Sequence, residues 1–112
     1  MNENVRIIDW IREYENYHAE QVEVIVFGEF DWGYTQYKIS PPPGKLMTMD
    51  EAMPYLTVEF NNDYGNRGCP PFAAYTANWI ISAASYDAYI SPFSIRRSPF
   101  QGYLPPMPGD IY

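Results

Sequence analysis

The stretch 21-QVEVIVFGEF-30 decides the fold, because it carries the strongest strand signal in the chain. Valines at positions 22, 24 and 26 alternate with Glu23, Ile25 and Phe27, so successive side chains point to opposite faces of a sheet. β-branched residues dominate the stretch, as they do in strands generally. We therefore predict a strand over residues 21–30.

The residues that follow predict a hairpin. Asp31–Gly33 form a plausible turn, and Tyr34–Ile39 form a second expected strand. The sequence Ser-Pro-Pro-Pro-Gly at 40–44 ends that strand, since proline has no N–H to donate to a strand ladder.

Upstream of the strand, residues 2–17 have the spacing of an amphipathic helix. Ile7, Ile8, Ile11 and Tyr14 fall on one stripe, and the acidic residues lie largely outside it. We expect Asn2 or Asn4 to cap the N-terminal end of this helix through its short amide side chain. His18 would then close the helix and interact with its dipole.

Downstream, Thr48–Glu51 match a capping box, in which a Thr hydroxyl and a Glu carboxylate satisfy each other's backbone donors. We expect the helix that begins there to be short, because Pro54 follows within two turns. Alternation over Tyr55–Phe60 predicts a third strand, and residues 61–71 form a long polar loop.

Residues 72–95 fit two interpretations. Phe72, Tyr75 and Trp79 continue a helical stripe, but the same residues also fit a meander of strands at 73–75, 79–84 and 89–95. We favour strands, since the upstream sheet needs further partners and Ile80 and Ile81 suit a strand.

The predicted fold class is therefore α+β: an N-terminal helix packed on a small antiparallel sheet, with a short second helix and an extended Pro-rich tail. Residues 1–98 would form a single domain, since a chain of 112 residues has the usual size of one. Residues 99–112 are rich in Pro and Gly, and we expect them to lie extended over the domain.

Charge is distributed unevenly along the chain. The net charge is −7, and residues 1–63 hold twelve acidic and four basic side chains. A negative field repels phosphate, so direct binding to nucleic acid is not expected, and a basic protein surface is the favoured partner. No signal peptide or membrane-spanning stretch is recognised, and Cys69 has no cysteine to pair with. We therefore expect a soluble protein of the cytoplasm.

Residues for common enzyme chemistry are scarce. One cysteine and one histidine cannot build a zinc site, and no phosphate-binding loop is present. A Cys69–His18 nucleophile pair is disfavoured, since Cys69 reads as an ordinary loop thiol. We expect no cofactor, no metal and no enzymatic activity. The exception to weigh is a small hydrolase that uses the carboxylates of Glu29 and Asp31.

Acidic and aromatic side chains are mixed around the predicted hairpin and the first helix. Tyrosine gives interfaces a rigid contact area with a polar tip, and an arginine can both ion-pair with a carboxylate and stack on an aromatic ring. The candidate partner-binding residues are Glu13, Glu15, Glu20, Glu23, Glu29, Asp31, Trp32, Tyr34 and Tyr37.

The strings 28-GEFDWGY-34 and 36-QYKI-39, with Tyr86–Asp87 and 94-SIRRSP-99, resemble short uncharacterised proteins of bacterial phages and conjugative elements. That class includes anti-restriction and anti-CRISPR inhibitors, many of them small acidic proteins without enzymatic activity that occupy a nucleic-acid site. Arg96 and Arg97 depart from a uniformly acidic mimic, and we expect them to be solvated or ion-paired.

The leading hypothesis is thus a non-enzymatic acidic binding module, an inhibitor from a mobile element that mimics nucleic acid. Two alternatives stay open: a structural or assembly protein that self-associates through sheet edges and the Pro-rich tail, and the small hydrolase.

Overall fold

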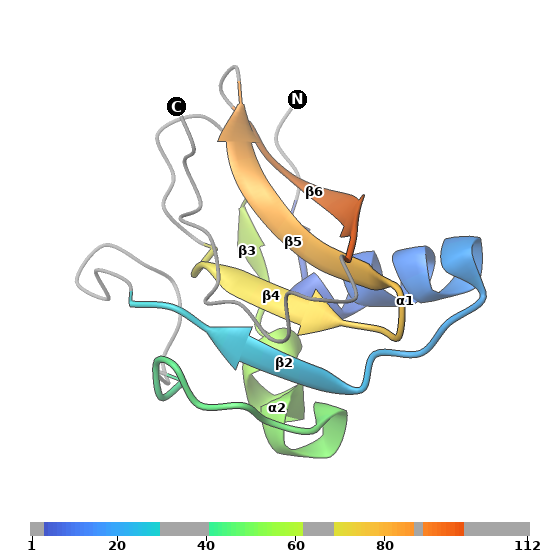
Figure 1. Ribbon diagram of the computed structural model, residues 1–112. Coiled ribbons are helices and arrows are strands. Elements are labelled where there is room, and N and C mark those ends of the chain that lie inside the picture. The colour runs from blue at the N-terminus through green and yellow to red at the C-terminus, as the bar shows by residue number, and fades with distance from the viewer. Residues whose placement is uncertain (1–3, 30–40, 62–68, 87–88, 98–112) are drawn as a thin grey trace.

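A computed structural model describes residues 4–29, 41–61, 69–86 and 89–97. Two helices and a four-stranded antiparallel sheet give the α+β fold that was predicted (Figure 1). Within the described ranges, no helix has the length and apolar character needed to cross a membrane.

The four-stranded sheet has the order β2-β4-β5-β6, and each neighbouring pair is antiparallel. Its strands are β2 (Val24–Phe27), β4 (Phe72–Tyr75), β5 (Trp79–Tyr86) and β6 (Tyr89–Arg96). The meander predicted for residues 72–95 is confirmed, and the helical alternative is wrong. Side chains of these strands are buried on both faces of the sheet, which is why the apolar residues also matched a helical stripe.

Strand β2 is shorter than predicted, and its described partners are not those expected. Phe27 lies opposite Phe72 of β4, and on the other edge Ile25 exchanges two backbone hydrogen bonds with Met47, both 2.8 Å. The predicted turn at Asp31–Gly33 and the strand Tyr34–Ile39 lie outside the described residues.

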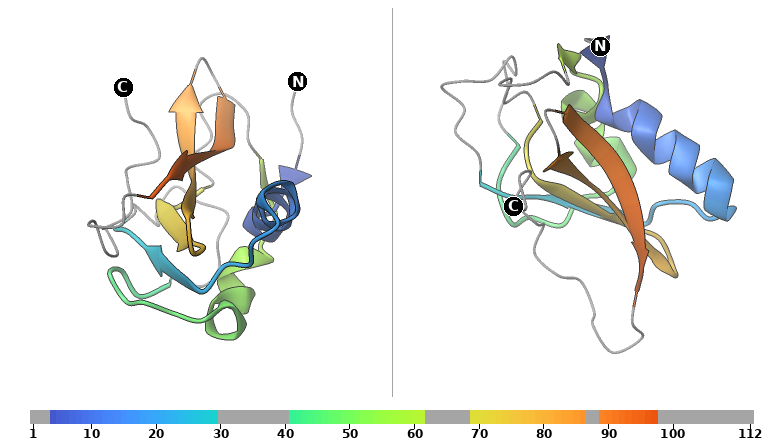
Figure 2. Two further views of the ribbon diagram at one scale, coloured as in Figure 1. Left: turned by 45° about the vertical axis from the view of Figure 1, so that its right-hand side comes forward. Right: turned by 90° about the horizontal axis from the view of Figure 1, so that it is seen from above.

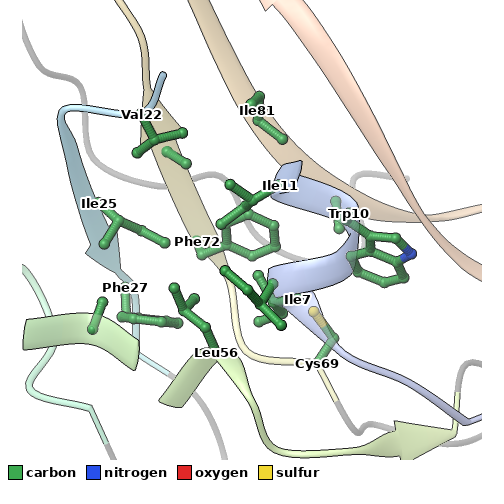
Figure 3. Close-up of a cluster of buried hydrophobic side chains, with 14 of the residues drawn as sticks. Ile7, Trp10, Ile11, Val22, Ile25, Phe27, Leu56, Cys69, Phe72 and Ile81 are labelled. Carbon is green, nitrogen blue, oxygen red and sulfur yellow. The ribbon is translucent and has the colours of Figure 1, made fainter. Parts of the chain in front are cut away.

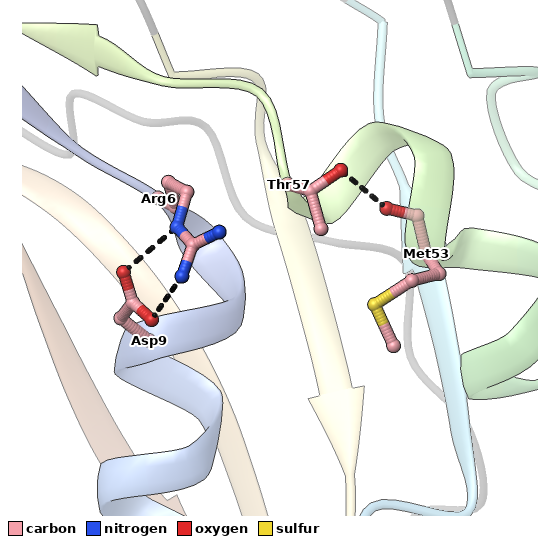
Figure 4. Close-up of polar contacts among 4 residues, drawn as sticks. All are labelled: Arg6, Asp9, Met53 and Thr57. Atoms are coloured by element: carbon pink, nitrogen blue, oxygen red, sulfur yellow. Dashed lines mark hydrogen bonds and ion pairs between the residues drawn. The ribbon is translucent and has the colours of Figure 1, made fainter.

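Helix α1 (Ile7–His18) begins later than predicted. Asn4 belongs to strand β1 (Asn4–Val5), which pairs with β3 (Phe60–Asn61), so Asn4 does not cap the helix. The N-cap residue is Arg6, which makes no side-chain cap bond. Its guanidinium instead holds the Asp9 carboxylate in the first turn, with Nε to Oδ2 at 3.0 Å and Nη2 to Oδ1 at 2.9 Å (Figure 4).

Helix α2 (Met49–Leu56) confirms the capping box and the short length predicted for this helix, although it continues past Pro54. The backbone N–H of Glu51 donates to Thr48 Oγ1, and Glu51 Oε1 accepts from the backbone N–H of Thr48. The helix continues through Pro54 to Leu56, so the strand predicted for Tyr55–Phe60 is wrong apart from Phe60. Ala52 and Leu56 lie one turn apart on the buried face, and their packing outweighs the missing hydrogen bond of the proline.

Both helices lie on the same side of the four-stranded sheet (Figure 2). Ile7 and Ile11 of α1 meet Leu56 of α2 and the sheet residues Phe72 and Ile81 in one buried cluster (Figure 3). Burying such side chains stabilises the fold by roughly 1.5–3 kcal/mol each before the loss of chain entropy is counted. The packing of α1 on this sheet face sets where the last turn of α1 lies.

Candidate functional site

The last turn of α1 carries a set of stacked rings that reaches across to the sheet. The ring of His18 lies almost parallel to that of Trp79, with centroids 3.8 Å apart and planes inclined by 15°. Tyr14 lies on a roughly parallel plane 6.1 Å from His18, and Tyr17 meets His18 edge-on at 4.9 Å. The guanidinium carbon of Arg96 lies 5.7 Å from the centroid of Trp79. We call these five residues the terminal aromatic cluster.

Helix spacing and sheet register together assemble the terminal aromatic cluster. Tyr14, Tyr17 and His18 are three and four positions apart, so they project from neighbouring points of the helix. Trp79 begins β5 and lies opposite Arg96, the last residue of β6. Directly opposed residues point to the same face of a sheet, so the indole and the guanidinium lie together on the face that α1 covers.

Two hydrogen bonds fix this end of α1 to β6. His18 Nε2 lies 2.9 Å from Ser94 Oγ, and the hydroxyl of Tyr14 donates to the carbonyl oxygen of Pro92 at 3.3 Å. Partial burial raises the pKa of Tyr14, and the carboxylate of Glu13 raises it further, so Tyr14 remains a protonated donor at neutral pH. His18 ends α1, as predicted, and its ring also bonds to the sheet.

Tyr17 and Arg96 are the members of the cluster that face solvent. The side chain of Tyr17 is 79% exposed, while His18 and Trp79 beneath it are half-buried. Glu13 lies one helical turn before Tyr17 and is also exposed. An exposed phenol ring, supported from below by stacked rings and flanked by a carboxylate, can contact a partner at small entropic cost because it is already held in place.

Two of the predicted binding acids are engaged in the fold. Glu15 Oε2 accepts a hydrogen bond of 2.8 Å from the backbone N–H of Val22. Glu20 Oε1 accepts from the hydroxyl of Thr76 at 2.6 Å and from the backbone N–H of Asn78 at 3.0 Å. Bonds from the Asn78 side chain and from Thr76 lower the pKa of Glu20. The Glu15 carboxylate joins α1 to the segment just before β2, and the Glu20 carboxylate joins the segment after α1 to the β4–β5 turn.

Of the other predicted residues, Glu13, Glu23 and Glu29 lie in the described part of the chain, and Glu23 and Glu29 are far apart. Glu13 lies on α1, Glu23 immediately precedes β2, and Glu29 follows the opposite end of β2. All three side chains are exposed. The strand between Glu23 and Glu29 puts them roughly 20 Å apart, at about 3.3 Å per residue. Asp31, Trp32, Tyr34 and Tyr37 lie outside the described residues.

Cys69 is a core residue and not the ordinary loop thiol that was expected. It is 4% exposed and lies beside Ile7, near the start of α1 (Figure 3). Burial raises its pKa, which keeps the thiol protonated and unreactive. His18 ends the same helix, about 16 Å away at 1.5 Å per residue, so the two side chains do not form a nucleophile pair.

Arg96 and Arg97 each lie over an aromatic ring of the sheet, and Arg96 is also exposed to solvent, as expected. Arg96 stacks on Trp79, and Arg97 lies with its guanidinium carbon 5.4 Å from the ring centroid of Tyr75. Arg97 Nη1 also donates to the carbonyl oxygen of Thr76 at 2.6 Å. In the parts of the chain that the structure describes, no three His, Cys, Asp or Glu side chains are grouped so as to hold a metal ion.

Only the helical part of the terminal aromatic cluster could be predicted from the sequence. The spacing of Tyr14, Tyr17 and His18 was visible along the predicted helix. Trp79 and Arg96 could not be linked to them, because the contact depends on how the helix crosses the sheet.

Comparison with known proteins adds little. No family model matches the chain, and no solved structure shows significant similarity to it. An alpha-agarase of Thalassotalea agarivorans is 32% identical to it in an alignment of 80 positions that covers 62% of this chain and 6% of the agarase. The match thus covers a small part of that enzyme and establishes no family for this chain.

Proposed function

We propose that this chain is a non-enzymatic protein-binding module that contacts a basic partner surface with Glu13, Tyr17 and the rest of the terminal aromatic cluster. The observation that carries the proposal is the 79% exposure of Tyr17 above the stacked rings of His18 and Trp79. Interface hot spots are enriched in tyrosine, tryptophan and arginine, and this cluster contains all three.

The expected partner chemistry follows from charge and ring geometry. The chain carries a net charge of −7, which would steer a basic surface towards it. At the site, an arginine of the partner could pair with the Glu13 carboxylate and stack on the Tyr17 ring. Arg96 makes a contact of this kind with Trp79 inside the molecule, which illustrates the geometry.

The finer hypothesis is a mobile-element inhibitor that imitates nucleic acid on a host defence enzyme in the cytoplasm. Its support is the acidic charge and the sequence resemblance to short phage proteins. Since Glu15 and Glu20 bond within the fold, the charges that stand in for phosphates would be Glu13, Glu23 and Glu29 among the described residues.

Affinity capture from a bacterial host lysate, followed by direct titration of the captured partner, tests the proposal. Tyr17→Ala should weaken binding about tenfold or more, as expected for a central aromatic contact. Glu13→Gln should weaken it less and should reduce its salt dependence, because one charge pair is removed.

Matched controls are available on other surfaces. Leu46→Ala removes another large exposed apolar side chain, and Glu59→Gln removes another exposed carboxylate. Both should bind like the wild type. If all four variants lost affinity for the partner equally, or if Tyr17→Ala left that affinity unchanged, this region would not be the binding surface.

Self-association through sheet edges is less well supported by the geometry. The outer edge of β2 is bonded to Met47 and Gly44. The backbone N–H of Arg97 donates to the Asn78 carbonyl oxygen, and residues that bond to β5 alternate along β6. Pro92 therefore falls at a position whose backbone nitrogen points away from β5, towards the open edge. Proline at that place blocks strand addition, and Tyr14 already occupies the Pro92 carbonyl. Sedimentation over a range of concentrations should therefore show a monomer.

The hydrolase alternative rests on an acid pair of which only Glu29 is described, exposed after the end of β2.

A second candidate that one observation favours is polysaccharide binding, because the similar protein is named an agarase and an exposed ring such as Tyr17 can stack on a sugar. Native electrophoresis through gels with and without dissolved agar would retard the wild type, and not Tyr17→Ala, if this candidate holds.

A further inference from the structure

His18 contacts every part of the terminal aromatic cluster that comes from α1 and from the start of β5. Its ring is roughly parallel to those of Tyr14 and Trp79, and its Nε2 lies 2.9 Å from Ser94 Oγ. The ring of Tyr17 meets it edge-on, with the two centroids 4.9 Å apart. A charge on His18 therefore acts at close range on the exposed ring of Tyr17.

Histidine is the side chain whose charge ordinarily changes between about pH 5 and pH 8, and His18 is the one histidine of the chain. Burial raises the pKa values of Cys69 and Tyr14, so both stay protonated over this range. Carboxylates ordinarily lose their proton near pH 4 and arginine keeps its own throughout. His18 is thus the side chain of the cluster that can respond to mild acid.

We propose that protonation of His18 weakens the binding of a basic partner to the terminal aromatic cluster. This inference rests on the function proposed above and adds its regulation. With His18 neutral, the Glu13 carboxylate and the Tyr17 ring attract a guanidinium of the partner. The imidazolium places a positive charge beneath that ring, where it repels the guanidinium and offsets the attraction of the ring for a cation.

The charged groups that surround His18 come from three parts of the fold and do not titrate in this range. Glu20 follows α1, and hydrogen bonds from Asn78 and Thr76 lower its pKa, with a contribution from the charge of His18. Arg96 on β6 lies over the same Trp79 ring that His18 stacks on. The neighbours on α1 are the uncharged phenols of Tyr14 and Tyr17, and β5 contributes the uncharged indole. The proton on His18 is therefore the variable charge of the site.

The size of the effect follows from distance. A guanidinium stacked on Tyr17 would lie about 8 Å from the His18 ring, since stacked groups are roughly 4 Å apart. Two unit charges at about this distance near a hydrated surface repel each other enough to weaken binding by about threefold. Added salt should reduce the effect, because the site is open to solvent on the Tyr17 side.

A calorimetric titration of the full chain tests the proposal. The probe is a synthetic peptide of six arginines, acetylated and amidated so that its own charge is constant. At equal ionic strength, the wild type should bind it about threefold more weakly at pH 5.5 than at pH 7.5. Leu46→Ala, on another surface, should show the same ratio.

Two substitutions remove the titrating group in different ways. His18→Phe keeps a flat ring against Trp79, and His18→Gln keeps a group that can bond to Ser94. Each should bind the peptide with the same affinity at pH 5.5 and pH 7.5. A wild-type affinity that is equal at both pH values, or a threefold change that persists in either variant, would overturn the proposal.

Nuclear magnetic resonance provides a second measurement that needs no substitution. Because the chain has one histidine, the imidazole C–H signals belong to His18. The affinity for the peptide should change over the same pH range as these signals. Saturating peptide should also move their titration to lower pH, since the coupling between two bound ligands is reciprocal. Signals that titrate identically with and without peptide would contradict the proposal.

Tyr17→Ala separates this inference from the function on which it rests. At pH 7.5 this variant should bind the peptide more weakly than the wild type. If it bound equally well, the cluster would not be the site for a basic ligand, and the proposed function would fail together with this inference. If it bound weakly while the wild type showed no dependence on pH, the proposed function would stand and the role of His18 alone would be rejected.

Discussion

Glu20 and Glu13 lie seven positions apart and have opposite roles. Glu20 accepts hydrogen bonds from Thr76 and Asn78 and so joins the end of α1 to the β4–β5 turn. Glu13 stands on the exposed face of α1 beside Tyr17. The two carboxylates contribute equally to the net charge of the chain. The Glu13 carboxylate is exposed, whereas the Glu20 carboxylate accepts hydrogen bonds within the fold.

This difference shows that some carboxylates of an acidic chain serve as hydrogen-bond acceptors within the fold and are not available to a partner. Backbone N–H groups that a turn leaves without a carbonyl partner need an acceptor, and a carboxylate is a strong one. The N–H groups of Val22 and Asn78 are satisfied in this way by Glu15 and Glu20. Substitutions around Glu20 and around Glu13 can distinguish carboxylates that stabilise the fold from carboxylates that are free to bind a partner.

The largest effect is expected from Thr76→Val. Thr76 is fully buried, and its hydroxyl donates to Glu20 and accepts from the backbone N–H of Trp79 at 2.9 Å. Valine has the same shape but leaves these partners unsatisfied, so the free energy of unfolding should fall by about 2 kcal/mol. Urea denaturation measures it. Thr57→Val is the control, since its hydroxyl bonds only to the Met53 carbonyl at an exposed helix end (Figure 4). Equal losses would contradict the role given to Glu20.

Glu20→Gln should have a smaller effect at neutral pH, because an amide can keep part of the bonding. The folded-state pKa of Glu20 lies below its ordinary value, so its stabilisation is complete above the unfolded-state pKa, about 4.3. It is lost as the pH falls from there through the folded-state pKa. The gap between wild type and variant should therefore narrow below about pH 4 in urea titrations. A gap that stays constant from pH 7 to pH 3 would show that the carboxylate charge is unimportant.

Ala19→Gly tests the residue that separates the two regions. Ala19 caps α1 with φ at 56°, in the left-handed region that favours glycine. The strain energy that glycine removes is larger than the entropic cost of its more flexible unfolded chain. The free energy of unfolding should therefore rise by roughly 0.5 kcal/mol. Ala77→Gly, at an exposed turn position without a positive φ, should instead lower stability in the same thermal unfolding experiment.

The smallest effects on stability are expected from Glu13→Gln and Tyr17→Ala. Both side chains are exposed, and substitutions at such positions usually change the free energy of unfolding by less than about 0.5 kcal/mol. The melting temperature should stay within about 2 °C of the wild type. A clear loss of stability in Tyr17→Ala would mean that its ring holds the His18–Trp79 stack together, and that its exposure does not mark a binding surface.

The sequence predicted those features that depend on local patterns. The capping box at Thr48 and Glu51 needs only residues three apart, and the buried stripe of Ile7, Ile8 and Ile11 needs only helical spacing. The meander of β4, β5 and β6 was recovered because β-branched residues and turn signals repeat along one stretch.

Features set by tertiary packing were missed. Asn4 has the chemistry of a helix cap but is used in strand pairing with Asn61, far along the chain. Pro54 was read as the end of a helix, whereas burial of Leu56 extends the helix past it. For the candidate site, the sequence shows how many acidic residues there are but not which of them bond within the fold. The partners of Glu20, Thr76 and Asn78, lie more than fifty positions away along the chain.

The register of the sheet also has a kinetic consequence. Partners across β5 and β6 range from Tyr86–Tyr89 to Trp79–Arg96, so that ladder can close between near neighbours on the microsecond timescale of hairpins. Joining β2 to β4 brings Phe27 to Phe72 and must close a far longer loop, with a correspondingly larger entropic cost. The hairpin should therefore nucleate folding, and docking of the first third of the chain should limit its rate.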